Sequence, residues 1–227
     1  MLYPTYDPTD KINAHKLAYL QHRLGVSISY NDLAHYKIIL NLYDMLEINK
    51  ISHLTCQPQM GDTLDGNFLG FVSYDNNYII MRNLSRKVLP NVRYHNYNIY
   101  GNYDNTKKWY VIPTQLPVLQ ERLTVIMTEG IFDILNVYFH IETEHTNKLY
   151  IAVCGIGYNG AIQALIRMGY LDINIVIYGD SDQDIRLYRG IKSDNAPFIT
   201  MATLYTNKLA KDYGDHTVGY ESRKVIL

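Results

Sequence analysis

Two stretches of the chain place carboxylates directly after an apolar run of residues. The stretches read VIMTEGIFDIL and IVIYGDSDQDI, and their central carboxylates are Glu129, Asp133, Asp180 and Asp182. Four carboxylates that converge at one edge of a sheet repel one another unless hard cations neutralise them. Oxygen donors of this kind suit Mg²⁺ and Mn²⁺. The spacing therefore predicts a site for Mg²⁺, or Mn²⁺, at these side chains.

The first stretch reads as a strand, a turn and a helix. Thr124–Thr128 is a short apolar run typical of a buried strand, and Ile131–Phe139 carries apolar residues at helical spacing. Gly130 supplies the tight turn between them. Glu129 is therefore expected at the C-terminal end of the strand, and Asp133 in the first helical turn on the same side.

The second stretch repeats this arrangement. Asn174–Tyr178 reads as a strand, and Asp180 and Asp182 follow it on either side of Ser181. Between the two stretches, a strand at Tyr150–Val153 and a helix at Ala161–Met168 complete a βαβ order. Asp and Gly are also ordinary loop residues, so either motif alone favours loop chemistry over a metal site. The two in series favour the metal site.

The order of these acidic motifs resembles that of the Toprim domain, which is shared by DnaG-type primases, topoisomerases and some nucleases. The motifs are Glu129-Gly130 with Asp133, followed by Asp180-Ser181-Asp182. The resemblance implies an α/β fold with a Toprim-like βαβ sheet core. It also implies a third acidic segment late in the domain, where the chain carries KDYGDH. Asp212 is the implied further metal ligand in that segment. Asp215 is a weaker candidate, for which a charged surface turn is an equal alternative.

Basic residues upstream resemble the basic subdomain of bacterial and phage primases. An apolar strand at Tyr78–Met81 ends in Arg82, and Arg93-Tyr94 follows after a polar loop. The resemblance implies that Arg82 and Arg93 bind the incoming triphosphate or the template, because guanidinium groups grip phosphate oxygens in pairs. Arg186 stands where related primases often carry an arginine. Asp184-Ile185 replaces the small residues usual there, which weakens that correspondence.

The activity implied by the resemblance is that of the RNA-polymerase region of a phage-like DNA primase. Such a protein makes short RNA primers from ribonucleoside triphosphates on single-stranded DNA, with Glu129, Asp180 and Asp182 as the catalytic acids. No Walker A sequence is present, so a separate replicative helicase is the expected partner. Two alternatives stay open. They are a Toprim-type metal-dependent nuclease and a replication scaffold without catalytic activity.

The composition is that of an ordinary globular protein. The 227 residues are 47% hydrophobic, and 21 Lys and Arg stand against 22 Asp and Glu, so overall charge does not drive DNA binding. Cys56 and Cys154 are too far apart for a zinc ribbon. Primases of this type usually carry a zinc-binding module, so we expect that the chain is a fragment, that its lineage dispenses with the module, or that another polypeptide provides it. Two unpaired cysteines and the absence of a signal peptide or a long apolar run predict a cytoplasmic protein without membrane segments, in a bacterial host if it is phage-encoded.

Three regions are expected along the chain: a helical N-terminal region at 1–60, a mixed or β-rich basic subdomain at 61–118, and the Toprim domain at 119–227. Helical spacing of apolar residues predicts helices at Asp10–Leu24 and Tyr30–Ile48, with Asn31 as the N-cap of the second. The loop Ile112–Leu119 contains two prolines and is the predicted boundary before the Toprim domain.

Overall fold

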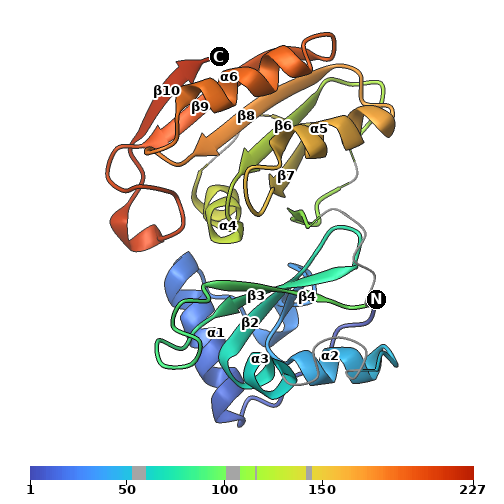
Figure 1. Ribbon diagram of the computed structural model, residues 1–227, viewed down its shortest axis with the longest axis vertical. Helices are drawn as coiled ribbons and strands as arrows, with labels where there is room; N and C mark the ends of the chain where they lie inside the picture. The colour runs from blue at the N-terminus through green and yellow to red at the C-terminus, as the bar shows by residue number, and fades with distance from the viewer. Residues whose placement is uncertain (53–59, 101–107, 116, 142–144) are drawn as a thin grey trace. The chain divides into compact units, whose positions relative to one another are not determined.

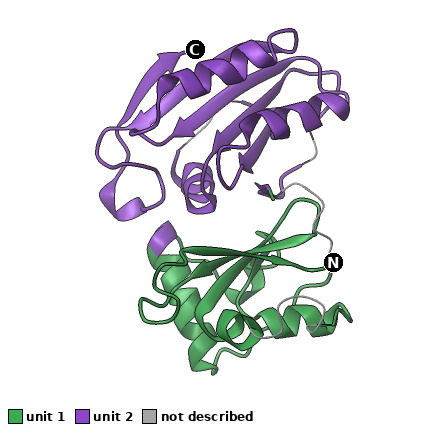
Figure 2. Cartoon of the chain, in the orientation of Figure 1, with its two compact units in different colours: residues 1–22, 26–108 green, residues 23–25, 109–227 purple. Residues whose placement is uncertain are grey.

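A computed structural model describes residues 1–52, 60–100, 108–115, 117–141 and 145–227 (Figure 1). Two compact units make up the chain: residues 1–22 and 26–108 form unit 1, and residues 23–25 and 109–227 form unit 2 (Figure 2). Cys56 lies outside the described residues. Within the described ranges, no helix is both long enough and apolar enough to cross a membrane.

Unit 1 combines short helices with an antiparallel sheet. Its elements are α1 (Lys11–Leu24, whose last two residues belong to unit 2), η1 (Tyr30–Asp32), β1 (Ile38–Ile39), α2 (Leu42–Ile48), α3 (Gly61–Asn67), β2 (Phe68–Val72), β3 (Tyr78–Asn83) and β4 (Tyr94–Asn98). The four strands pair in the order β1-β2-β3-β4. Apolar residues of α2 and α3 pack with alternate residues of β2 and β3 to form the core of this unit. The residues of the first two predicted regions thus share one sheet and its helices.

The helix predicted over Tyr30–Ile48 is wrong for most of its length. Ile38–Ile39 instead forms β1, which pairs with Phe71 and Gly70 of β2. Lys37, just before it, has a φ of 54°, which no α-helix allows. Long-range strand pairing overrides the local spacing here, and two adjacent β-branched residues favour the strand. Within this range η1 is a short 3-10 helix and only α2 is α-helical, with Asn41 and not Asn31 as its N-cap.

Unit 2 is an α/β fold, as the sequence predicted at that level. Its elements are β5 (Tyr110–Val111), β6 (Leu123–Thr128), α4 (Ile131–His140), β7 (Lys148–Ala152), α5 (Tyr158–Arg167), β8 (Ile173–Gly179), α6 (Ile185–Asp194), β9 (Ile199–Asn207), η3 (His216–Val218) and β10 (Ser222–Ile226). The strands and helices expected around both acidic stretches are confirmed to within a few residues. Tyr110–Val111, placed by the sequence before the boundary loop, pairs with β7 in this sheet.

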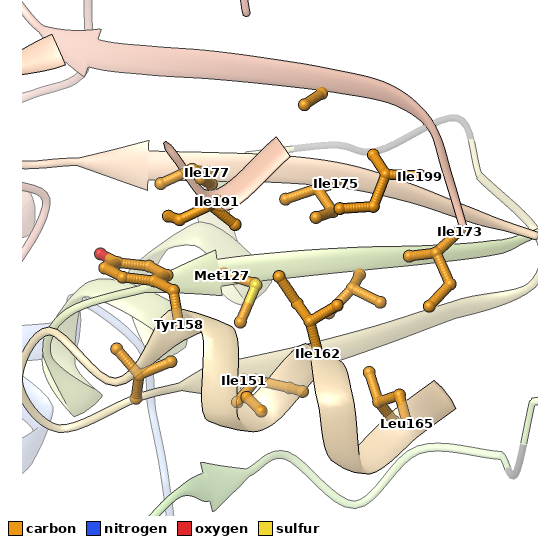
Figure 3. Packing of buried hydrophobic residues seen from close by; sticks show 14 of the residues in the cluster. Met127, Ile151, Tyr158, Ile162, Leu165, Ile173, Ile175, Ile177, Ile191 and Ile199 are labelled. Carbon is orange, nitrogen blue, oxygen red and sulfur yellow. The ribbon is translucent and has the colours of Figure 1, made fainter. Parts of the chain in front are cut away.

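The sheet of unit 2 has the order β10-β9-β8-β6-β7-β5. Strands β9, β8, β6 and β7 run parallel, and β10 and β5 are antiparallel edge strands. One face is covered by α5 and α6, where Met127, Ile162 and Ile191 belong to the same buried cluster (Figure 3). Helix α4 contacts β6, β7 and β8. Because side chains alternate along a strand, Ile126 points to the face opposite Met127.

Candidate active site

The order of strands creates a switch point between β6 and β8. From β6 the chain passes through α4 to β7 on one side, and from β8 it passes through α6 to β9 on the other side. Strands β6 and β8 are parallel neighbours, and Thr128 lies opposite Tyr178 in the register. In open α/β sheets, ligands bind beyond the carboxyl ends of strands at such a point. Glu129 directly follows the last residue of β6, and Asp180 directly follows the last residue of β8.

Asp133 is the most buried of the acids. Its side chain lies over Gly130, where a Cβ atom would collide with Oδ2, so this turn needs a glycine. Oδ1 accepts a hydrogen bond of 3.0 Å from the backbone N–H of Tyr213. Burial, followed by the negative charges of Asp212 and Asp180, raises the pKa of Asp133 to about 7. The charges of Asp212 and Asp180 therefore lie close enough to Asp133 to oppose its ionisation.

Asp180 belongs to the same cluster of charge. Its side chain is 13% exposed, and burial, with Asp212 next, raises its pKa above the ordinary range. Burial together with the charges of Asp180 and Glu129 raises the pKa of Tyr188 to about 12. Gly179 lets the Tyr188 hydroxyl approach the end of β8, since a Cβ there would collide with it. The charges of Glu129 and Asp180 thus both raise the pKa of Tyr188, which agrees with the position of the two carboxylates at adjacent strand ends.

Tyr158 contributes a hydroxyl to the same neighbourhood. It is buried, and its Oη has no hydrogen-bond partner among the described residues. Its pKa is raised well above the ordinary value, first by burial and then by Tyr188, Glu129, Asp180 and Asp133. A buried hydroxyl without a partner is costly, so this group suits a bound water or ligand beside the acids.

Lys211 was not predicted as part of the site. Its Nζ lies 3.0 Å from Oδ2 of Asp182 and 3.4 Å from Oδ2 of Asp180. The backbone N–H of Ser181 donates a hydrogen bond of 2.7 Å to the carbonyl oxygen of Lys211, which joins the two loops through the main chain. The only signal in the sequence was its position directly before Asp212 in the third acidic segment.

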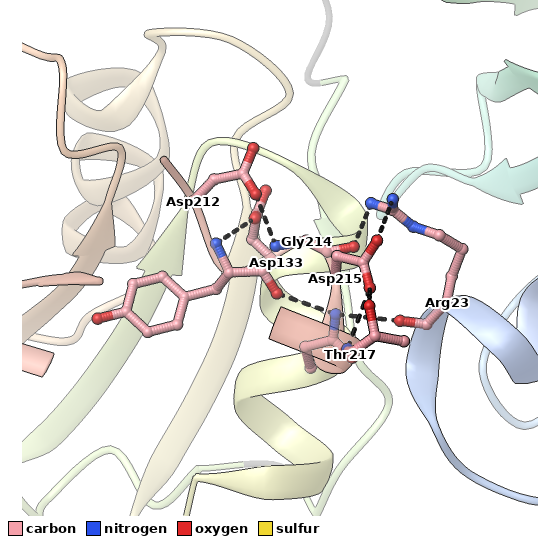
Figure 4. A network of polar contacts seen from close by, with 8 residues as sticks. Arg23, Asp133, Asp212, Gly214, Asp215 and Thr217 are labelled. Atoms are coloured by element: carbon pink, nitrogen blue, oxygen red, sulfur yellow. Dashed lines mark hydrogen bonds and ion pairs between the residues drawn. The ribbon is translucent and has the colours of Figure 1, made fainter. Parts of the chain in front are cut away.

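The turn that carries Asp212 is held by a second network (Figure 4). The Arg23 guanidinium pairs with Oδ2 of Asp215 at 3.0 Å and also donates to the carbonyl oxygen of Gly214. Asp212 accepts a hydrogen bond of 3.0 Å from the N–H of Gly214. On α4, Asn136 donates to the carbonyl oxygen of Tyr213 at 2.9 Å. Arg23 and Asn136 therefore fix the backbone on which Asp212 stands.

Asp215 has a structural role in this network. Besides its pair with Arg23, its Oδ1 accepts hydrogen bonds from the N–H and the hydroxyl of Thr217, which makes it the N-cap of η3. Both oxygens of Asp215 are therefore engaged, Oδ1 by Thr217 and Oδ2 by Arg23. Of the two acids in the KDYGDH segment, Asp212 is the one whose negative charge raises the pKa of both Asp133 and Asp180.

The donor chemistry of these acids fits Mg²⁺ or Mn²⁺, although no group of three His, Cys, Asp or Glu side chains among the described residues forms a ready-made metal cage. Mg²⁺ keeps several water ligands and is commonly held by one or two carboxylates together with substrate phosphates. Burial is the first cause of the raised pKa of Asp133 and Asp180, and the neighbouring carboxylates raise it further. A bound cation would neutralise that excess negative charge.

Arg82 and Arg93 lie in unit 1 and share one aromatic ring. Arg82 is within β3, where it is the cross-strand partner of Tyr94, and its guanidinium lies 5.0 Å from the centre of that ring. The Arg93 guanidinium lies 5.8 Å from the same centre. Nε and Nη1 of Arg82 are buried and have no hydrogen-bond partner among the described residues. Unsatisfied guanidinium donors of this kind suit an anion such as a phosphate.

Arg186 is engaged locally. Its Nε donates to Oδ2 of Asp184 at 2.8 Å, while Oδ1 of Asp184 caps the first turn of α6 by accepting from the Arg186 N–H. The arginine side chain is 86% exposed. The residue pair that departs from the primase pattern therefore supplies the partner of Arg186, and in this arrangement the guanidinium serves its own helix end.

Comparisons of the chain with protein-family models, with curated protein sequences and with solved structures each found no match. Unit 2 carries acids at the ends of β6 and β8 with Lys211 beside them. Unit 1 carries Arg82, two of whose buried donors have no hydrogen-bond partner among the described residues.

Proposed function

We propose that the chain is the RNA-polymerase region of a Toprim-containing, DnaG-type DNA primase, encoded by a bacteriophage and working in the cytoplasm of its bacterial host. It makes short RNA primers from ribonucleoside triphosphates on single-stranded DNA, together with a separate replicative helicase. The observation that supports the proposal is that Glu129 and Asp180 follow the ends of the adjacent parallel strands β6 and β8 at the switch point and both raise the pKa of Tyr188, while Asp212 and Asp180 raise that of Asp133.

In this function, Glu129, Asp180 and Asp182 hold Mg²⁺ or Mn²⁺, and Asp133 and Asp212 complete or orient the ligand set. The bound cations supply neutralisation of the phosphate charge and activation of the attacking hydroxyl. The primer 3′-hydroxyl loses its proton to solvent as its oxygen bonds to the α-phosphorus of the incoming nucleotide, and the bond from that phosphorus to the bridging oxygen breaks to release pyrophosphate. The acids would provide the negative charge that holds the cations beside the phosphates of the substrate.

Arg82 and Arg93 bind phosphate oxygens of the incoming triphosphate or of the template backbone. Arg82 supports this role because two of its buried donors are unsatisfied among the described residues, and Tyr94 holds both guanidinium groups beside one ring. Stacking on an aromatic ring orients a guanidinium without using its N–H donors, so the donors stay available to an anion.

The test is template-dependent synthesis of labelled oligoribonucleotides on single-stranded DNA, with Mg²⁺ or Mn²⁺. Wild type is compared with an Asp180→Asn/Asp182→Asn double variant, which removes two charges without changing side-chain size. Asp172→Asn is the matched control, because Asp172 is an exposed aspartate that precedes the opposite end of β8. The proposal expects product from wild type and control and none from the double variant. Cleavage of the DNA by wild type but not by the double variant, without RNA synthesis, would assign a nuclease. The absence of both RNA synthesis and DNA cleavage would instead assign a replication scaffold without catalytic activity.

A further inference from the structure

Lys211 occupies the position between the two aspartates of the DSD sequence. Its ammonium contacts one oxygen of each, Oδ2 of Asp182 at 3.0 Å and Oδ2 of Asp180 at 3.4 Å. Burial first, and then the charges of Asp212 and Asp182, raise the pKa of Asp180, whereas Lys211 lowers it. The lysine is therefore the positive charge that partly balances this group of acids.

The main chain, and not the ion pair, sets where Lys211 stands. The hydrogen bond of 2.7 Å from Ser181 N–H to the Lys211 carbonyl places residue 211 beside the DSD loop whatever its side chain does. The side chain of Lys211 is 58% exposed and that of Asp182 is 57% exposed. An ammonium on a flexible, solvated stem exchanges partners at little cost, because exposed ion pairs are weak.

We propose that Lys211 is a built-in counter-cation for Asp180 and Asp182, which a divalent cation displaces when it binds. This inference rests on the proposed function, because it takes these aspartates to be metal ligands. Two consequences follow from the geometry. Lys211 lowers the affinity of the nucleotide-free protein for metal, and its released ammonium becomes a donor for the phosphate oxygens of the nucleoside triphosphate that joins the metal.

The size of the effect follows from the exposure of the pair. Exposed ion pairs contribute little, and competition by one of them reduces the affinity for a divalent cation by roughly two- to fivefold. Salt screens solvated charges over about 8 Å at physiological ionic strength, so the difference should shrink as the salt concentration rises. Both effects are measurable without any catalytic turnover.

The experiment measures Mn²⁺ binding to the full chain by electron paramagnetic resonance at low salt, without nucleotide. Lys211→Met removes the charge and keeps much of the stem, Lys211→Arg keeps the charge, and Lys208→Met is the matched control. Lys208 is also exposed and ion-paired in the same part of the chain, but its partner is Glu221. The proposal expects Lys211→Met to bind Mn²⁺ roughly two- to fivefold more tightly than wild type, and the other two variants to match wild type.

The outcomes separate this inference from the proposed function. If wild type binds Mn²⁺ and the Asp180→Asn/Asp182→Asn variant does not, the metal site stands. Equal or weaker binding by Lys211→Met would then overturn the counter-cation role alone. If wild type shows no Mn²⁺ binding that depends on these two aspartates, both the metal site and the role of Lys211 are overturned.

Discussion

Replacing Asp133 by asparagine should make the metal-free protein more stable at neutral and alkaline pH. Asparagine keeps an Oδ1 acceptor for the Tyr213 N–H, which Asp133 binds at 3.0 Å, and it removes the buried charge. The pKa of Asp133 is raised from 3.8 to about 7, chiefly by burial and then by Asp212 and Asp180. The variant therefore removes an unfavourable ionisation and retains the hydrogen bond.

The magnitude follows from the linkage between protonation and folding. A group with a raised pKa in the folded state contributes its full stability below the unfolded value, near pH 4, and loses it as the pH rises through about 7. The difference between 7 and 3.8 is about three pKa units, and each unit corresponds to about 1.4 kcal/mol. Asp133→Asn should match wild type near pH 4 and exceed its free energy of unfolding at pH 8 by up to about 4 kcal/mol.

Urea unfolding followed by circular dichroism, with a chelator present, measures this difference at pH 4.5, 6 and 8. Asp172→Asn is a control of opposite sign, because hydrogen bonds from Arg122 and Thr200 lower the pKa of Asp172. Its contribution is present above the unfolded pKa and lost on acidification, so this variant should be the less stable one at neutral pH. An Asp133→Asn protein no more stable than wild type at pH 8, or a difference that does not vary with pH, would refute the reasoning.

Three further predictions concern other parts of the chain. Arg82→Gln should raise the KM for nucleotide, or weaken template binding, by about ten- to a hundredfold, since hydrogen bonds to charged groups contribute about 1.5–3 kcal/mol. Steady-state primer synthesis measures the KM and a DNA-binding assay measures the affinity for template. An unchanged KM together with an unchanged affinity would contradict the prediction. Lys16 is buried in unit 1, and burial lowers its pKa from 10.5 to about 8. Because the unfolded chain binds more protons than the folded chain between these pH values, wild type should gain stability relative to Lys16→Met as the pH rises from 8 to 10.5. Thermal melting measures this difference, and a parallel pH dependence of the two proteins would contradict it. Arg23→Met removes the contacts to Asp215 and Gly214, and hydrogen exchange at the Gly214 amide should become at least several-fold faster; unaltered protection would show that Asn136 alone holds the turn.

Local sequence patterns were sufficient for the elements that carry the acids. Strands β6 and β8 are continuous apolar runs, and each ends abruptly on a glycine and a carboxylate, so both the strand and the position of its acid could be predicted. Helix α4 followed from apolar spacing after Gly130. The same reasoning failed at Ile38–Ile39, because the pairing of those residues with β2 depends on a strand that lies far along the chain.

The parts of the site that could not be predicted are contacts between distant residues. Arg23 forms an ion pair with Asp215, although the two residues are separated by most of the sequence. Nothing in the sequence pattern of α1 distinguishes this arginine from the other polar residues of the helix. Lys211 reaches Asp180 and Asp182 only because β9 runs beside β8 and the loop after it returns to the DSD loop. The neighbours of a charged side chain depend on tertiary packing, which periodicity does not encode.

We propose that the acids at the ends of β6 and β8 support metal-dependent RNA synthesis on a DNA template. Incorporation of labelled ribonucleotides with Mn²⁺, with and without single-stranded DNA, is to be measured for wild type, Asp180→Asn/Asp182→Asn and Asp172→Asn. We expect short RNA from wild type and Asp172→Asn only when template is present, and none from the double variant. Equal product from the double variant, or no template-dependent product from wild type, would contradict it.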